Sequence, residues 1–237
     1  MGVHGEDLGM LAIEGAVAVD WEDIAAFDWQ GAPALLIADV GDNNAVRDHV
    51  TLYAVRDPGR EGASAPLLWK IDFRYPDGAR DCEAVAVDPV DRSVLLLSKR
   101  EYPQHLYRIP LPDDGAVPPG VSVEELLNPN VRGIPPASLA EMLESPVFGR
   151  FLGMPTAMDI ARDGRFAVVV TYRHAYRFWR AQHQSWAEVF AQKPETIPLT
   201  ALRQTEAGAI DADGRTLIYG SEGRHTPLLS APLPPVH

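Results

Sequence analysis

The chain has 237 residues, of which 46% are hydrophobic, and a formal net charge of −12 at pH 7. This length allows one large all-β domain or two small ones. The negative charge repels phosphate backbones and anionic lipid, so we expect neither nucleic acid nor a membrane as a partner. The one cysteine, Cys82, excludes an internal disulfide and a cysteine metal cluster, and we expect it to be a buried structural thiol.

The first predicted element is a strand-like run over residues 8–15, with no possible partner before it in the sequence. Propellers often close by giving a terminal strand to the blade at the other end of the chain. We therefore expect this run to be the fourth strand of the last blade. No basic and apolar secretory leader stands at Met1, so the chain is either cytoplasmic or its recorded start is not the natural one.

A carboxylate, a short run of small apolar residues and an Asp before a turn occur together four times along the chain. Each copy is followed by a turn, an apolar run and a third strand, in the same order and near the period expected of propeller blades. The four copies cover residues 20–28, 80–88, 156–163 and 204–211. The pattern predicts four β-meander blades over about 20–75, 81–127, 155–199 and 205–233.

We therefore predict an all-β fold, a single β-propeller domain over residues 1–237 with four recognisable four-stranded blades. The ring either closes with four blades or has five to six blades and is completed by another chain. In the second case two copies of this chain could form a homodimer that completes the propeller. Residues 128–154 break the repeat, and 137–148 predict a short helix with a Ser-x-x-Glu start. This insertion is either a lid over the propeller mouth or an ordinary surface excursion.

The inner strand of each propeller blade lines the central channel, so equivalent side chains from different blades converge there. The acids at the predicted strand starts are Glu22, Glu83, Asp159 and Glu206. Carboxylates at close quarters raise one another's pKa or require a cation, and a hard cation with oxygen ligands meets that need. We expect one or two Ca²⁺ ions there. The alternative is that these acids only bond to backbone amides between blades.

Polar residues also follow the second strand of each predicted blade, where loops on one rim of a rigid scaffold tend to carry function. In the first blade they supply several oxygens within five residues and are further metal-ligand candidates, although Asp and Asn are also common turn formers. In the second and third blades they are basic and are suited to stabilising developing negative charge. The metal candidates are Asp39, Asp42 and Asn43, and the basic candidates are Lys99, Arg173 and His174.

These motifs resemble those of an uncharacterised group of bacterial, mostly secreted propeller proteins with D-x-E-D-h-A, A-D-h-G-D-N and Y-P-D-G segments. The resemblance covers nearly the whole chain and implies a secreted or periplasmic location. Relatives often have a small residue where Asp159 stands, and usually one more blade upstream. The matching segments are 20–25, 38–43, 75–84, 98–99, 171–172, 204–207 and 221–223.

The broader likeness is to calcium-dependent propeller hydrolases, such as diisopropyl fluorophosphatase, paraoxonase and gluconolactonase-like enzymes, and to propeller phytases. It implies a hydrolase of a small neutral ester, such as a lactone, phosphotriester or aryl ester, with the channel calcium as Lewis acid. Asp42 or Glu22 would then serve as base or nucleophile. The alternative is a non-catalytic propeller that binds a ligand or protein partner and holds a structural calcium, since fold does not fix function.

Overall fold

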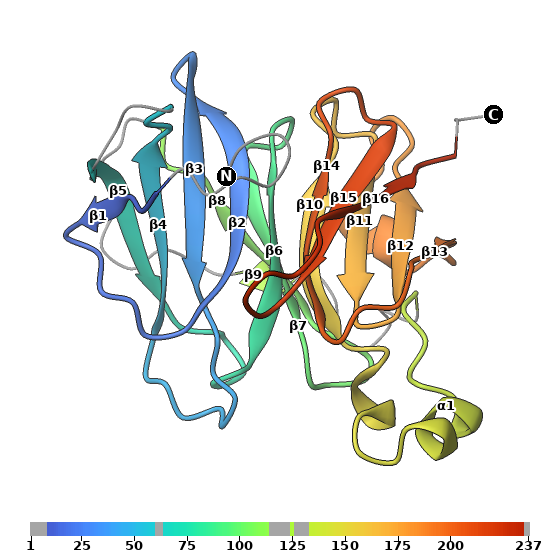
Figure 1. Cartoon of the computed structure of the whole chain (residues 1–237). Helices are drawn as coiled ribbons and strands as arrows, with labels where there is room; N and C mark the ends of the chain where they lie inside the picture. Colours follow the sequence, from blue (N-terminus) through green and yellow to red (C-terminus); the bar gives the residue numbers. More distant parts are fainter. Residues whose placement is uncertain (1–8, 60–63, 114–123, 126–132, 235–237) are drawn as a thin grey trace.

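The structure is a computed structural model that describes residues 9–59, 64–113, 124–125 and 133–234. These residues form four sheets that follow one another along the chain (Figure 1). Within each sheet, strands that are consecutive in sequence pair antiparallel, as in a meander, except for the N-terminal strand described below. The all-β fold and the four predicted β-meander units are therefore confirmed. Closure of the ring and the number of blades in it stay predictions.

The first two sheets follow the predicted unit boundaries, because their strands are rich in β-branched and aromatic residues and are separated by turn residues. Sheet 1 contains β2 (Trp21–Trp29), β3 (Ala32–Asp39), β4 (Val50–Arg56) and β5 (Ser64–Phe73), with β1 (Ala12–Glu14) added at its outer edge. Sheet 2 contains β6 (Cys82–Asp88), β7 (Ser93–Ser98), β8 (Leu106–Pro110) and β9 (Glu124–Glu125).

The last two sheets have the same order of inner, middle and outer strands. Their first hairpins turn at Gly164 and Gly214, which have the positive φ values of 69° and 68° that favour glycine. Sheet 3 contains β10 (Pro155–Ile160), β11 (Phe166–Thr171), β12 (His174–Trp179) and β13 (Glu195–Pro198). Sheet 4 contains β14 (Thr205–Ile210), β15 (Thr216–Ser221) and β16 (Leu229–Pro232).

The N-terminal strand lies on sheet 1 rather than on the last sheet, so the prediction that residues 8–15 close the last blade is wrong. β1 pairs parallel with β5, and the Ser64 hydroxyl donates to Glu14 at 2.6 Å. Leu11 and Ile13 pack against the buried side chain of Tyr53 on the same sheet. This burial of apolar surface gives β1 its place, and the described part of sheet 4 has three strands.

Apolar side chains fill the spaces between neighbouring sheets. Separate clusters join sheet 1 to sheet 2, sheet 2 to sheet 3, and sheet 3 to sheet 4. Cys82 is fully buried in the first of these, as predicted for a structural thiol. Sheets 1 and 4, at the two ends of the series, instead face an apolar groove of about 400 Å³ lined by Ile24 and Leu35 on one side and Glu206 and Ala207 on the other.

The predicted helical insertion is confirmed over its described residues. Helix α1 (Leu139–Glu144) begins at the N-cap Ser138, whose hydroxyl accepts from the Glu141 amide while the Glu141 carboxylate accepts from the Ser138 amide. A short 3₁₀ turn, η1 (Gly149–Phe151), follows, and Figure 1 shows α1 beyond the ends of the strands. Residues 128–132, part of the predicted insertion, lie outside the described residues. A second short helix, α2 (Trp186–Phe190), covers sheet 3.

Candidate functional site

The first strand pair of every sheet has a β-bulge at its beginning. The pairing register skips one residue between Trp21 and Asp23, and skips one at the equivalent place in each other sheet. A bulge leaves its extra residue unpaired and turns that side chain away from the regular alternation. The four extra residues are Glu22, Glu83, Thr156 and Glu206. Three sheets therefore turn a glutamate in the same direction, and the third sheet turns a threonine.

The three glutamates line one cavity of about 430 Å³, which we call the channel cavity. Its polar lining comes from sheets 1, 2, 3 and 4, and its apolar lining from the insertion and from the segment before β14. The polar side chains are Asp20, Glu22, Asn43, Glu83, Lys99, Arg100, Tyr172, Arg203, Gln204, Glu206 and Glu222. The apolar side chains are Phe148, Phe151, Leu152 and Leu202.

Lys99, at the end of β7, connects the polar side chains of three sheets. Its side chain and that of Glu83 are 5% and 7% exposed, and the two form an ion pair. The Lys99 ammonium also donates to the Tyr172 hydroxyl at 3.0 Å, and the Tyr172 hydroxyl donates to Glu206 at 2.9 Å. Glu83, Lys99, Tyr172 and Glu206 thus form a continuous hydrogen-bonded row across the cavity.

Glu22 lies beside this row, above the backbone of Gly41. A Cβ atom at Gly41 would lie 2.3 Å from the Glu22 Oε1 atom and 2.6 Å from the carboxylate of Asp20. Real Cβ atoms do not approach other atoms so closely, so glycine leaves the space that the two carboxylates occupy. The glycine of the Ala38–Asn43 loop is therefore part of the site.

The environment separates the pKa values of two of the glutamates. Burial, together with the charges of Glu83 and Asp20, raises the pKa of Glu22 to about 9. Burial also raises the pKa of Glu83, but the nearby ammonium of Lys99 counteracts it, and the value is about 7. At neutral pH Glu22 is therefore protonated, while Glu83 is close to its midpoint.

The fourth sheet adds a second pair of acids. Burial, followed by the charge of Glu222, raises the pKa of Glu206, although the hydrogen bond from Tyr172 opposes this rise. Gln204 also reaches the Glu206 Oε1 atom, at 3.4 Å. Burial and the charges of Glu83 and Glu206 raise the pKa of Tyr172, which keeps its phenol protonated and able to donate.

Asp159 does not join the channel acids, contrary to the prediction. Its two carboxylate oxygens accept from the amides of Ile210 and Ile160, each at 2.8 Å, so it joins sheet 3 to sheet 4. The residue of sheet 3 at the channel register is Thr156, whose hydroxyl is buried and donates to the Thr205 carbonyl at 2.8 Å. The prediction failed because it assigned the acid of β10 to the channel, whereas the bulge at the start of that strand gives the channel position to Thr156.

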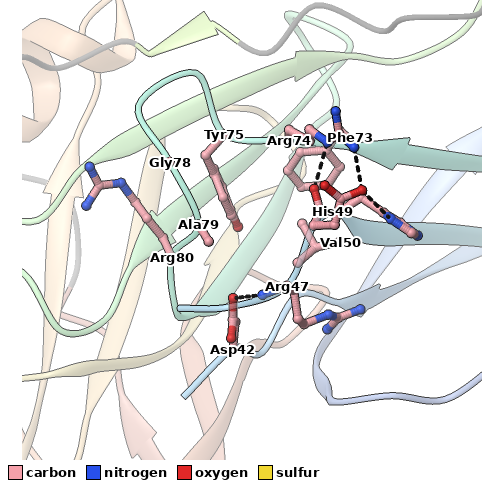
Figure 2. A pocket seen from close by; sticks show the side chains of 11 residues that line it. Asp42, Arg47, His49, Val50, Phe73, Arg74, Tyr75, Gly78, Ala79 and Arg80 are labelled. Carbon is pink, nitrogen blue, oxygen red and sulfur yellow. Dashed lines mark hydrogen bonds and ion pairs between the residues drawn. The ribbon is translucent and has the colours of Figure 1, made fainter. Parts of the chain in front are cut away.

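The loop acids of sheet 1 are also occupied by the backbone. Asp39 accepts from the amides of Val19 and Asp20 and forms an ion pair with Arg47 at 2.8 Å. Asp42 accepts from the amides of Val46 and Arg47 at 2.9 and 2.8 Å. Figure 2 shows its carboxylate turned toward Arg47, at a separate crevice of about 220 Å³. These bonds hold the loop, so the structure does not place Asp42 as a base in the channel cavity.

Arg173 and His174 lie in another cavity, of about 340 Å³, between sheet 3 and the insertion. Arg173 forms an ion pair with Glu141 of α1 at 3.2 Å. The buried Nδ1 atom of His174 has no hydrogen-bond partner among the described residues, and burial and the charge of Arg173 lower the pKa of the imidazole. Their predicted role beside the channel acids therefore does not agree with their positions, because Tyr172 lines the channel cavity whereas Arg173 and His174 line this other one.

The predicted calcium ligands do not form a preformed calcium site in the described residues. Calcium takes six to eight oxygen ligands. Asp39, Asp42 and Asp159 direct their oxygens at backbone amides, the Asn43 side-chain oxygen accepts from Arg100, and Glu83 is paired with Lys99. No group of three or more His, Cys, Asp or Glu side chains in the described ranges is arranged to hold a metal. The donor set therefore does not fit the ion.

Several residues of the cavity were not predicted as site residues. Tyr172 and Glu222 stand in the segments 171–172 and 221–223, whose positions at the strand ends are a signal that could have identified them. Asp20 precedes the first bulge, and nothing in its neighbourhood distinguishes it from a turn residue. The apolar side of the cavity could not be found from the sequence, because an insertion has no equivalent in the repeat.

Comparisons with known proteins give structures of similar fold at low identity. No protein-family model and no curated protein matches the chain. A protein of Bacteroides uniformis described as a 6-phosphogluconolactonase is 11% identical, with a TM-score of 0.46, over 89% of this chain and 67% of that one. The periplasmic gluconolactonase PpgL of Pseudomonas aeruginosa is 13% identical, with a TM-score of 0.43, over 89% and 57%.

A third structure, the β-propeller domain of Cps50 (Swd1) from Myceliophteria thermophila, is 10% identical, with a TM-score of 0.45, over 90% of this chain and 58% of that one. The chain thus spans 67%, 57% and 58% of these three proteins. At such TM-scores the likeness carries no argument about activity. No helix among the described residues is long and apolar enough to cross a membrane.

Proposed function

We propose that the chain is a hydrolase of small neutral esters, lactones first, and that the reaction takes place in the channel cavity. The observation that carries the proposal is the pair of neighbouring glutamates with separated pKa values, about 9 for Glu22 and about 7 for Glu83. Two carboxyl groups whose environments separate their pKa values in this way are suited to the roles of acid and base at neutral pH.

The two glutamates and their neighbours in the channel cavity can share the steps of ester hydrolysis. Glu83, in its ionised form, is the general base for a water molecule. Glu22, in its protonated form, is the general acid for the leaving oxygen. Lys99 is the donor that stabilises the oxyanion, because its ammonium has three N–H groups, and the two directed at Glu83 and Tyr172 hold it in place before any substrate binds. The phenol of Tyr172 donates its one proton to Glu206 and so helps to position Lys99.

Lactone hydrolysis begins at the carbonyl carbon of the ester group. The oxygen of a water molecule forms a bond to the carbonyl carbon while Glu83 takes one proton of that water. The tetrahedral oxyanion collapses, the bond from the carbonyl carbon to the ring oxygen breaks, and the proton of Glu22 goes to that oxygen. The product is a hydroxy acid, and the two glutamates exchange their protons with solvent to restore the starting state.

The charge of the cavity favours an uncharged substrate. Several carboxylates surround Lys99, and Arg100 is already bound by the Asp81 carboxylate at 2.6 Å. A phosphorylated or otherwise polyanionic ester would meet these carboxylates with few free cations. Phosphotriesters and aryl esters remain within the proposed substrate class because they are neutral.

Calcium stays a prediction from the sequence, and no step above passes through a metal. The alternative of a non-catalytic binding propeller also stays open to test, and a panel of lactones, phosphotriesters and aryl esters decides between the two.

The test of the proposal is the pH dependence of kcat/KM on the best substrate of that panel. We expect a bell-shaped profile, rising with an apparent pKa near 7 as Glu83 ionises and falling near 9 as Glu22 ionises. E22Q and E83Q should each lose at least about 100-fold in kcat, the usual size of an acid or base contribution. E144Q, at an exposed position of α1, is the matched control. Full activity in E83Q contradicts the proposal.

A further inference from the structure

The channel cavity has two unlike sides. Glu22, Glu83 and Glu206 lie on the propeller side, while Phe148, Phe151 and Leu152 of the insertion lie on the other, together with Leu202. We call the three insertion residues the insertion wall. Its side chains touch the cavity although the repeat of the four sheets does not require them. The reacting groups and the apolar surface therefore come from separate parts of the chain.

The insertion wall is held in place by specific packing. Gly149 lies so close to α1 that a Cβ atom there would be 2.5 Å from the Met142 Cα atom. Gly153 approaches the Pro135 carbonyl in the same way, where a Cβ atom would be at 2.6 Å. The ion pair between Arg173 and Glu141 ties α1 to sheet 3. Two glycine contacts and one ion pair thus fix the wall beside the acids.

Part of the wall is partly exposed to water. Phe148 is 56% exposed, and Phe151 and Leu152 are intermediate. When an apolar group of a ligand covers apolar side chains that are exposed to water, binding becomes more favourable. Each methylene that the ligand buries contributes about 0.8 kcal/mol, which corresponds to about 4-fold in affinity. The carboxyl groups of Glu22, Glu83 and Glu206 do not contribute to the binding of such an apolar group. The wall is therefore the part of the site that can distinguish substrates by their side group.

We infer that the insertion wall selects the substrate, and that the preferred substrate is a neutral ester or lactone carrying an apolar alkyl or aryl group of several carbons. This inference rests on the proposed function, because it assigns a substrate class to the same cavity. The ester group lies at the glutamates, and its apolar group lies against Phe148, Phe151 and Leu152. The insertion thus determines specificity while the four sheets supply the reacting groups.

The experiment is a series of lactones of one ring size with unbranched side chains of increasing length. For the wild-type chain, kcat/KM should rise about 4-fold per added methylene over the first few carbons. F151A and L152A should flatten this rise, so that the ratio of kcat/KM between the longest and the unsubstituted lactone falls below the wild-type ratio in both variants, whereas L143A should keep the wild-type ratio. L143A is the matched control, since Leu143 is 71% exposed on the same insertion and does not line the cavity.

The outcomes separate this inference from the proposed function. Hydrolysis of the lactones without any dependence on side-chain length in the wild-type chain overturns the inference and leaves the proposed function in place. An equal loss on short and long lactones in F151A and L152A, with the wild-type melting temperature retained, also overturns it. Failure of the wild-type chain to hydrolyse any lactone of the series overturns the inference, and failure on the phosphotriesters and aryl esters as well overturns both. The wild-type series needs no variant, so poor folding of a variant cannot hide the answer.

Discussion

Replacing Lys99 by methionine tests the electrostatics of the channel cavity directly. Methionine keeps most of the length of the side chain but removes the charge, and it leaves the buried carboxylate of Glu83 without its partner. Removing one member of a buried ion pair costs about 3–5 kcal/mol of the free energy of unfolding. Because both side chains are nearly inaccessible to water, we expect K99M to fall in this range wherever Glu83 is ionised.

The cost should depend on pH in a defined direction. Glu83 has a pKa of about 7, and Lys99 lowers it, so the pKa rises further when Lys99 is absent. Below that raised pKa, Glu83 binds a proton and becomes neutral, and the penalty disappears. The loss of stability in K99M should therefore be large at pH 9 and small at pH 6, which urea unfolding at the two pH values measures.

The double variant K99M/E83Q completes the cycle. An amide at position 83 carries no charge, so it should recover most of the stability that K99M loses at pH 9. K193M, at an exposed lysine, is the control and should have no measurable effect at either pH. An equal loss at pH 6 and pH 9, or no recovery in K99M/E83Q, would refute this account of the cavity.

Three further predictions follow from the same contacts. G41A should lower kcat/KM at least about 10-fold, because the added Cβ atom would displace Glu22 and a small misplacement of a reacting group has an effect of this size. An unchanged kcat/KM would contradict the position of Glu22. D23A should cost about 2–6 kcal/mol in urea unfolding, because the amides of Val85 and Met158 lose their shared acceptor. D28A is the control and should cost well below this, because Asp28 is exposed on β2 and accepts from the exposed amide of Gly31. Elemental analysis, with a thermal melt before and after chelation, should show no stoichiometric calcium and no shift, and one tightly bound calcium per chain would overturn our reading of the donor set.

The sequence contains enough information for the four meander units but not for the register of their inner strands. The fourfold pattern of acid, small apolar run and turn identifies each unit, because strands and hairpin turns are local. Whether Glu22 or Asp23 faces the channel depends on the bulge, and a shift of one residue moves a side chain to the other face. Asp159 was misassigned for this reason, and Thr156 was overlooked.

The position of the N-terminal strand could not be predicted for a different reason. An apolar run of a few residues can cover any sheet that has an open edge, and both the first and the last sheet offered one. The structure shows that Leu11 and Ile13 meet the apolar outer side of sheet 1, where Tyr53 and Val55 are buried. Such a choice depends on the shapes of two distant surfaces, which periodicity and turn signals do not contain.

With the exception of Asp20, which lines the channel cavity, the acids of the inner strands and of the loops beside them divide by side-chain length. Asp23, Asp39, Asp42, Asp81 and Asp159 all accept hydrogen bonds from backbone amides, most of them in another strand or sheet. The bulge residues Glu22, Glu83 and Glu206 are one methylene longer, and each lines the channel cavity.

An aspartate holds its carboxylate close to the backbone, where amides are available, whereas a glutamate can extend past the backbone into a cavity. The same charge therefore fastens the sheets in one case and faces the cavity in the other. E83D should follow from this division: the shorter side chain would draw the carboxylate away from Lys99 while keeping its charge. A loss of the pH optimum near neutrality in E83D, with the fold retained, would show that the reach of the side chain, and not the presence of an acid, places the base.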